Sequence, residues 1–262
     1  MNRIDATFQE LKKQGRKALI SFITAGDAGL DTTEQLVLQL EASGTDIIEL
    51  GIPFSDPIAE GPVIQEASVR ALKNGTKLVD VFALVRRLRE KTQIPILLML
   101  YLNSIFGFGT EHFFELCAES GVDGVIVPDM PFEERDEIQA VADRAGVYSI
   151  SMVAPTSHDR IATIAAAAQG FLYCVSSTGV TGTRSEFPTD FDAFFNAIRQ
   201  STNVPYAVGF GISGPEQAKI MSAYCDGVIV GSAIVKIIAQ YGKGSVEPVG
   251  AFAASLRAAL DG

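Results

Sequence analysis

The segment DIIELGIPFSDPIAEGPVIQ, residues 46–65, joins a strand-like apolar run to a loop that contains three prolines. The apolar run contains one carboxylate, Glu49, and the loop contains another at Glu60. A carboxylate inside an apolar strand costs free energy unless it is paired or neutral. Two acids in different environments can divide acid and base roles between them. The segment therefore indicates a carboxylate-based active site or, alternatively, a salt-bridged structural glutamate followed by a rigid turn.

The apolar run at 46–52 is one of eight similar runs along the chain. Each is short and bounded by Gly, Pro, Asp or Asn, and they cover 18–24, 46–52, 94–101, 124–127, 148–153, 170–176, 204–210 and 226–231. Nearly continuous hydrophobicity is typical of strands that are buried on both faces. Helical patterns lie between and after the runs, at 31–43, 78–91, 111–120, 133–145, 159–168, 191–200, 215–223, 233–240 and 249–260.

Eight strands alternating with helices predict an α/β fold, namely a single-domain (β/α)8 TIM barrel of the phosphate-binding type that spans residues 1–262. We expect an extra N-terminal helix at 3–13 and a short extra helix, 233–240, after the eighth strand. An open doubly wound sheet is the alternative, which the lack of a GxGxxG motif after the first strand disfavours. Extra chain length follows the second and sixth strands, so the loops there are candidate lids.

Composition and charge restrict the classes of function. The net charge of −10 argues against nucleic-acid binding, which needs a basic face. The three cysteines, Cys117, Cys174 and Cys225, form no CxxC motif, predict no disulfide framework or zinc site, and fit a cytoplasmic protein. Neither an N-terminal signal nor a membrane-spanning run is present, so no membrane association is expected. Because His112 and His158 are the only histidines, we expect no metal site and assign acid–base work to carboxylates.

Two glycine turns predict a phosphate site. The seventh strand ends in GFGIS, residues 209–213, and the eighth ends at Gly231, before Ser232 and the short extra helix that Ser232 is placed to cap. Phosphate sites after strands 7 and 8 of such barrels use backbone N–H groups at a helix N-terminus, so no lysine is needed. The loop at 180–183 offers a further N–H. The alternative is that the glycines only serve tight strand-to-helix turns.

A substrate that spans the mouth of the barrel would reach from this phosphate site to the second strand. Burial should raise the pKa of Glu49 above its ordinary value of about 4.3, which permits proton transfer near neutral pH. Glu60, in the loop, should stay ionised if it is partly solvated. Phe22, Met99 and Tyr173 are candidate apolar walls of the pocket, with ordinary core packing as the alternative for each.

The run IELGIPFSDP at 48–57 resembles the signature of the tryptophan synthase alpha chain family. So do GVTG at 179–182, GFGIS at 209–213 and GSAIV at 231–235, and the similarity covers the whole chain in order. The resemblance implies a lyase of L-tryptophan biosynthesis that cleaves indole-3-glycerol phosphate into indole and glyceraldehyde 3-phosphate. The implied retro-aldol step uses no metal or organic cofactor. It also implies an α2β2 assembly with a beta chain that holds pyridoxal phosphate and receives the indole through a tunnel.

The resemblance also implies roles for individual residues. Glu49 is the implied general acid/base that protonates indole C3 and takes a proton from the glycerol hydroxyl, and Glu60 is the carboxylate that accepts the indole N–H. Thr181 is implied to touch this second carboxylate when the lids close. The implied substrate-binding residues are Phe22, Met99, Tyr173, Thr181, Phe210 and Ile212. The implied phosphate-binding residues are Gly182, Gly211, Gly231 and Ser232, and the implied beta-chain contacts are Pro53, Asp56, Tyr101 and Asn103.

Glu60 departs from the family pattern, which has aspartate at this position. The extra methylene moves the carboxylate by about a bond length, and a misplacement on the order of 1 Å can cost about a hundredfold in rate. The departure keeps a second function open, that of a catalytically weak, ligand-sensing subunit that activates the beta chain. A third possible function is that of a sugar-phosphate isomerase or epimerase. The motif in the second strand argues against it. Ser177, where several relatives have arginine, alters the expected lid contacts.

Overall fold

A computed structural model of the chain describes residues 1–157, 159–175, 191–209 and 211–262. Its described strands form one sheet, in which every neighbouring pair is parallel and the order is β5-β4-β3-β2-β1-β9-β8-β7-β6. The strands are β1 Ala18–Thr24, β2 Ile47–Gly51, β3 Ile96–Met99, β4 Gly124–Ile126, β5 Tyr148–Ser149, β6 Met152–Val153, β7 Leu172–Val175, β8 Tyr206–Gly209 and β9 Gly227–Val230. Each of the eight predicted runs contains at least one of these strands.

The fifth predicted run is divided into β5 and β6, and this division closes the barrel. β5 pairs with β4, whereas β6 pairs with β7. Only Ile150 and Ser151 separate the two strands; the Ile150 N–H donates to the carbonyl of Val125 and the Ser151 carbonyl accepts from Tyr173 N–H, both at 2.9 Å. One segment, 148–153, therefore belongs to both ends of the sheet, and the predicted (β/α)8 barrel is confirmed.

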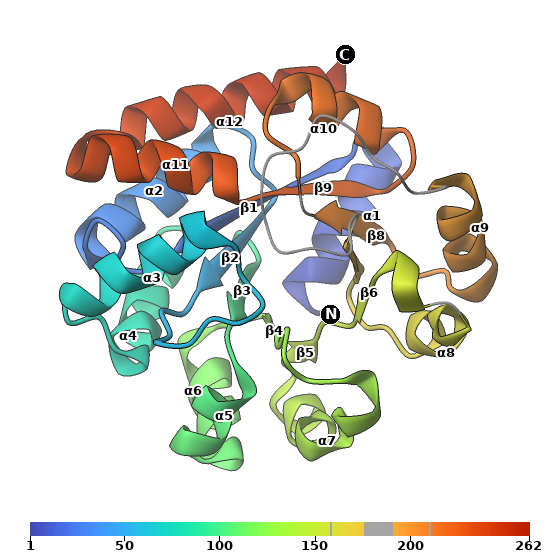
Figure 1. The fold of residues 1–262 in the computed structure, drawn as a ribbon, viewed down its shortest axis with the longest axis horizontal. Coiled ribbons are helices and arrows are strands. Elements are labelled where there is room, and N and C mark those ends of the chain that lie inside the picture. The colour runs from blue at the N-terminus through green and yellow to red at the C-terminus, as the bar shows by residue number, and fades with distance from the viewer. Residues whose placement is uncertain (158, 176–190, 210) are drawn as a thin grey trace.

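Helices form a ring around the strands (Figure 1). They are α1 Arg3–Gln14, α2 Leu30–Ala42, α3 Pro62–Lys73, α4 Leu78–Arg89, α5 Leu102–Phe108, α6 Thr110–Ser120, α7 Asp136–Ala145, α8 Arg160–Ala166, α9 Phe191–Ser201, α10 Pro215–Ser222, α11 Ser232–Tyr241 and α12 Val246–Asp261, with short 3-10 helices at Phe132–Glu134, Pro155–Ser157 and Gly242–Ser245. The predicted helices are all present. The predictions missed α3 and α5, so much of the length after the second strand is helix rather than loop.

The extra helix α1 closes the N-terminal end of the barrel. Ile4, Phe8 and Leu11 are buried on one side of it and belong to the same apolar cluster as the barrel interior. The Asn2 side chain caps the helix by accepting from Ile4 N–H, and its amide donates to the carbonyl of Asp123 at 2.8 Å. With this end covered, the carboxyl ends of the strands are the open face on which such barrels build their sites. No helix within the described ranges is long and apolar enough to cross a membrane.

Candidate active site

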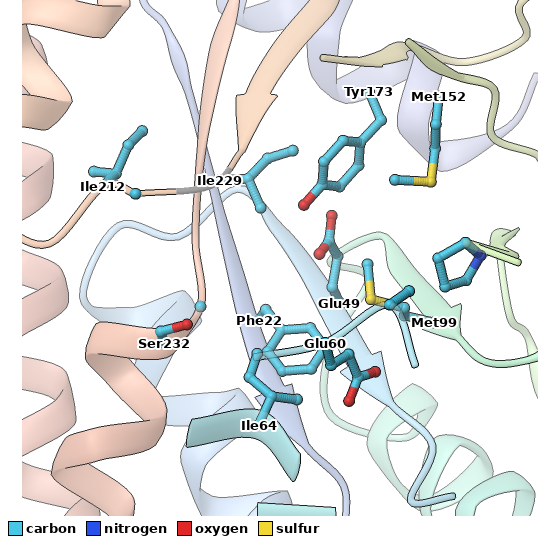
Figure 2. Close-up of a pocket in the computed structure, with 14 residues that line it drawn as sticks. Phe22, Glu49, Glu60, Ile64, Met99, Met152, Tyr173, Ile212, Ile229 and Ser232 are labelled. Atoms are coloured by element: carbon cyan, nitrogen blue, oxygen red, sulfur yellow. The ribbon is translucent and has the colours of Figure 1, made fainter. Parts of the chain in front are cut away.

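A pocket lies at the carboxyl ends of the strands. The space between its side chains measures about 670 Å³, including the part open to solvent, which is in the range of small-molecule sites. Figure 2 shows side chains from opposite sides of the barrel pointing into it. The lining residues are Phe22, Glu49, Ala59, Glu60, Ile64, Met99, Pro128, Met152, Tyr173, Gly211, Ile212, Ile229, Gly231 and Ser232. Nine of these fourteen were predicted from the sequence as site residues, and the structure brings these nine together.

Glu49 lies in the middle of β2 and is fully buried. Neither of its carboxyl oxygens has a hydrogen-bond partner within the described part of the chain. Burial raises the pKa of Glu49 to about 8, because the charged form loses its hydration without a compensating cation. No ion pair to Glu49 is found among the described residues. The described part of the chain therefore does not support the alternative that Glu49 is a salt-bridged structural residue.

Tyr173, at the middle of β7, faces Glu49 across the barrel interior. Its hydroxyl points toward the carboxyl group of Glu49 (Figure 2). Burial, and then the nearby charge of Glu49, raise the pKa of Tyr173 well above its ordinary value. The phenol therefore stays protonated beside Glu49 at neutral pH. Gly209 makes room for this ring, since a Cβ at that position would lie 2.5 Å from the Tyr173 hydroxyl.

Glu60 sits in the loop directly before α3, on the same pocket as Glu49. It is only 7% exposed, and its Oε2 has no hydrogen-bond partner among the described residues. Burial raises the pKa of Glu60 to about 7. The loop folds inward and removes most of the side chain from water, so the condition under which Glu60 was expected to stay ionised, partial solvation, is largely unmet.

The two carboxyl groups thus have different proton affinities in one pocket. At pH 7 Glu49, with a pKa of about 8, is mostly protonated, whereas Glu60, with a pKa of about 7, is roughly half ionised. Such a pair can supply one acid and one base at the same pH. Among the described residues no group of three or more His, Cys, Asp or Glu side chains is arranged to hold a metal ion.

The opposite side of the pocket includes the backbone of two glycines. Gly211, with φ of +85°, turns the chain after β8, and Gly231 is the N-cap of α11. Ser232 is the first residue of α11 and makes no capping bond, so the predicted cap was wrong. The first turn of α11 instead leaves N–H groups without helical acceptors and at the positive end of the helix dipole, a geometry that suits an anion.

Three predicted site residues, Thr181, Gly182 and Phe210, lie outside the described residues, as does Ser177. Ile64, Met152, Pro128, Ile229 and Ala59 line the pocket but were not predicted. Ile64 belongs to the missed helix α3, and its only signal was the spacing of Ile64, Ala67 and Ala71 after Pro62, a residue favoured in the first turn of a helix. Met152 follows the break between β5 and β6, which the sequence pattern does not reveal.

The four residues predicted to contact a partner fall into two pairs. Asp56 and Asn103 are exposed, whereas Pro53 and Tyr101 are buried within the chain. Two large apolar side chains are exposed near them: Ile58, at 75%, on the loop that contains Asp56, and Phe106, at 47%, on α5, the helix that contains Asn103. We refer to Asp56, Ile58, Asn103 and Phe106 as the rim surface.

Comparison with known proteins places this fold and pocket in a family. A family model described as "Tryptophan synthase alpha chain" matches residues 8–259. A tryptophan synthase alpha chain from Caldanaerobacter subterraneus is 54% identical over 240 residues, which is 92% of each chain. One from Thermoanaerobacter is 50% identical and covers 99% of this chain and all of its own length. Among solved structures, the alpha subunit from Legionella pneumophila has a TM-score of 0.89 at 38% identity, with 100% of this chain and 99% of that chain covered.

A Pyrococcus furiosus chain, solved in a study of mutual activation of the tryptophan synthase α2β2 complex, has a TM-score of 0.85 at 38% identity and covers 92% of this chain and 98% of its own. The fold and the pocket define the chain as a TIM-barrel protein with a small-molecule site at the carboxyl ends of its strands. Within that class, the chain belongs to the tryptophan synthase alpha chain family. It is accordingly a lyase of tryptophan biosynthesis.

Proposed function

We propose that this pocket performs the retro-aldol cleavage of indole-3-glycerol phosphate to indole and glyceraldehyde 3-phosphate, with Glu49 and Glu60 as the catalytic residues. The observation that supports this most directly is the presence of two buried carboxyl groups, each with a raised pKa, in one pocket whose far side is a helix N-terminus. The reaction needs an acid at carbon, a base at nitrogen and an anchor for a phosphate ester. The pocket offers a candidate for each.

The proton transfers balance with these two residues alone. Protonated Glu49 donates its proton to indole C3, while ionised Glu60 takes the N–H proton, which gives the indolenine tautomer. Glu49, now a carboxylate, accepts the proton of the adjacent glycerol hydroxyl. That oxygen forms the aldehyde, the carbon–carbon bond breaks, and its electron pair returns to the indole ring as Glu60 gives the proton back to nitrogen. Both residues end in the protonation states in which they began.

The substrate is oriented by its two ends. We place the indole ring against the apolar side chains of Phe22, Ile64, Met99 and Tyr173, where burial of its surface contributes to binding. The phosphate is bound by the backbone at Gly211, Gly231 and Ser232, and Gly182 is a further phosphate-binding residue by family resemblance. Thr181, Phe210 and Ile212 complete the substrate-binding set by family resemblance.

We also propose a beta chain as the partner in an α2β2 assembly, docked on the rim surface. Exposed apolar side chains at Ile58 and Phe106, next to Asp56 and Asn103, support this because large apolar groups are enriched in interface cores. Pro53 and Tyr101 support the surface from below. The pyridoxal phosphate of the complex belongs to the beta chain, and the alpha chain uses no cofactor of its own. We assign the chain to the cytoplasm and treat residues 1–262 as one domain.

The experiment that tests the catalytic assignment compares the unaltered chain with Glu49→Gln. We expect indole release to fall by roughly 10³-fold, since the proton donor and acceptor are lost. Binding of indole-3-propanol phosphate, measured by calorimetry, should persist, since the apolar and phosphate contacts remain. Full activity of Glu49→Gln would refute the role of Glu49. Loss of ligand binding in the variant would show instead that Glu49 holds the pocket together.

A further inference from the structure

Tyr101 lies beneath the loop that presents Glu60. It precedes α5 and is buried, with 2% of its surface exposed. Its hydroxyl oxygen accepts a hydrogen bond from the backbone N–H of Ala59 at 3.0 Å, and Ala59 is the residue before Glu60. The Tyr101 ring stacks on Phe54 of the same loop, with 4.9 Å between ring centroids and 19° between planes. One side chain therefore holds the loop at two points.

The hydroxyl proton of Tyr101 is still available after this contact. A tyrosine hydroxyl that accepts from an N–H keeps its own O–H as a donor. Oε2 of Glu60 is buried and lacks a hydrogen-bond partner among the described residues. The charge of Glu60 acts together with burial to raise the pKa of Tyr101, which places the two groups close enough to interact. The phenol is thus a possible donor close to the Glu60 carboxyl group, although it makes no hydrogen bond to Oε2 in this structure.

The length of the Glu60 side chain makes such a support necessary. Glutamate has one more rotatable bond than the aspartate usual in the family, and each freely rotating bond spreads the carboxyl group over more positions. Catalytic groups lose rate steeply when they are misplaced by about 1 Å. A fixed backbone at Ala59 and a donor at the carboxylate both restrict where the group can lie.

We propose that Tyr101 is a positioning residue for the lyase reaction, which holds the loop at Ala59 and orients the Glu60 carboxyl group toward the indole nitrogen. The proposal rests on the proposed function. It reassigns a residue that family resemblance placed at the partner contact, because the buried side chain points into the chain's own loop rather than to the surface.

Three other carboxyl groups lie around Glu60 and Tyr101. Glu49 on β2 lies in the same pocket, and Asp56 is exposed on the same loop. Asp129, after β4, accepts from Leu102 N–H at 3.0 Å and lies near enough to affect the pKa of Tyr101. Asp56 and Asp129 cannot donate a hydrogen bond when they are ionised, so neither replaces the Tyr101 hydroxyl as a donor.

The test is Tyr101→Phe, which removes one oxygen and keeps the ring stacked on Phe54. We expect kcat for indole release to fall roughly tenfold, the order expected for one lost hydrogen bond near a reacting group, with KM little changed because the phosphate end is intact. Without the donor, the ionised form of Glu60 is less stable, so the acid limb of the pH–rate profile should move to higher pH. A change in packing alone would move neither this limb nor the ratio of kcat to KM.

Tyr148→Phe is the matched control. It removes a tyrosine hydroxyl that donates to Asp5 at 2.6 Å, at the N-terminal end of the barrel, and it should leave kcat and the pH profile unchanged. Both variants are assayed alone and with saturating beta chain, and their thermal unfolding is compared. If the unaltered chain is active and Tyr101→Phe has the same kcat and the same acid limb of the pH–rate profile, the proposed role of Tyr101 is refuted. An unaltered chain that releases no indole would instead count against the proposed function.

Discussion

The carboxyl group of Glu49 is tuned by burial alone. Desolvation is the cause of its raised pKa, and no cation among the described residues opposes it. Glu60 is tuned in the same way but retains slight exposure, which agrees with its lower pKa. Two residues of one type therefore acquire different pKa values through a difference in their depth in the pocket.

This difference predicts a bell-shaped pH dependence of kcat/KM. Activity should rise with pH as Glu60 loses its proton around pH 7 and fall as Glu49 loses its own around pH 8. Because the two groups share a pocket, the limbs report the pair rather than either residue. Initial rates of indole release between pH 5.5 and about 9.5 measure both limbs. Replacement Glu60→Gln should lower the maximum and abolish the acid limb; a flat profile over this range would contradict the assignment.

Glycines at the ends of the strands set the shape of the pocket. A Cβ on Gly51 would lie 2.5 Å from the Phe22 ring, and Gly209 similarly accommodates Tyr173. Of the two glycines that line the pocket, Gly211 and Gly231, Gly211 has a left-handed backbone conformation, which glycine adopts most easily. Glycines at these strand ends thus make room for the rings of the pocket as well as serving turns.

Gly211→Ala should therefore weaken binding of the phosphate ester. Alanine at φ of +85° is strained, and relief of the strain would move the loop away from the phosphate. We expect KM to rise roughly tenfold and kcat to stay within about threefold, with a loss of stability of about 1 kcal/mol. Inhibition by glycerol 3-phosphate gives an independent measure of the phosphate contact.

Gly214→Ala is the control in the same loop. Its φ of −172° is extended, and no atom lies within 4 Å of the position of a new Cβ. Its kinetic constants should match those of the unaltered chain. If both variants behave alike, the backbone at Gly211 does not form the phosphate site.

Much of the element structure was predictable, and the exceptions have physical causes. Strands such as β1 and β2 are buried on both faces and appear as unbroken apolar runs. Helix α3 was missed because Pro53, Pro57 and Pro62 favour a loop, although a proline in the first turn is compatible with a helix. The burial of Glu60 and Tyr101 depends on how the loop folds back over the pocket, which is a tertiary effect that local pattern does not encode.

At the scale of the whole molecule, the closed barrel brings residues far apart in sequence onto one face. The pocket draws on β1, β2, β3, β6, β7 and β9, and the rim surface lies on the loop after β2 and on helix α5 after β3. Glu60 lies between the two, since its loop both lines the pocket and bears Ile58. A partner on the rim surface would therefore contact the loop that holds Glu60.

Phe106→Glu should weaken the response to the beta chain and leave the activity of the isolated chain unchanged. A charge placed in an apolar contact costs binding free energy, so roughly tenfold more beta chain should be needed for half-maximal stimulation. Titration of indole release against beta-chain concentration measures this. Ile220→Glu is the control, because Ile220 is 59% exposed on α10, across the barrel from α5 (Figure 1). Equal responses of the two variants would exclude the rim surface as the docking site.

The central claim is that this pocket, with glutamate at position 60, cleaves indole-3-glycerol phosphate. The most direct test is to measure indole release from that substrate by the purified chain, alone and with a beta chain added. The account predicts measurable turnover by the chain alone and a strong increase with the beta chain. No turnover in either assay, with a phosphate ligand still bound and beta-chain activity still stimulated, would contradict it and favour a ligand-sensing subunit.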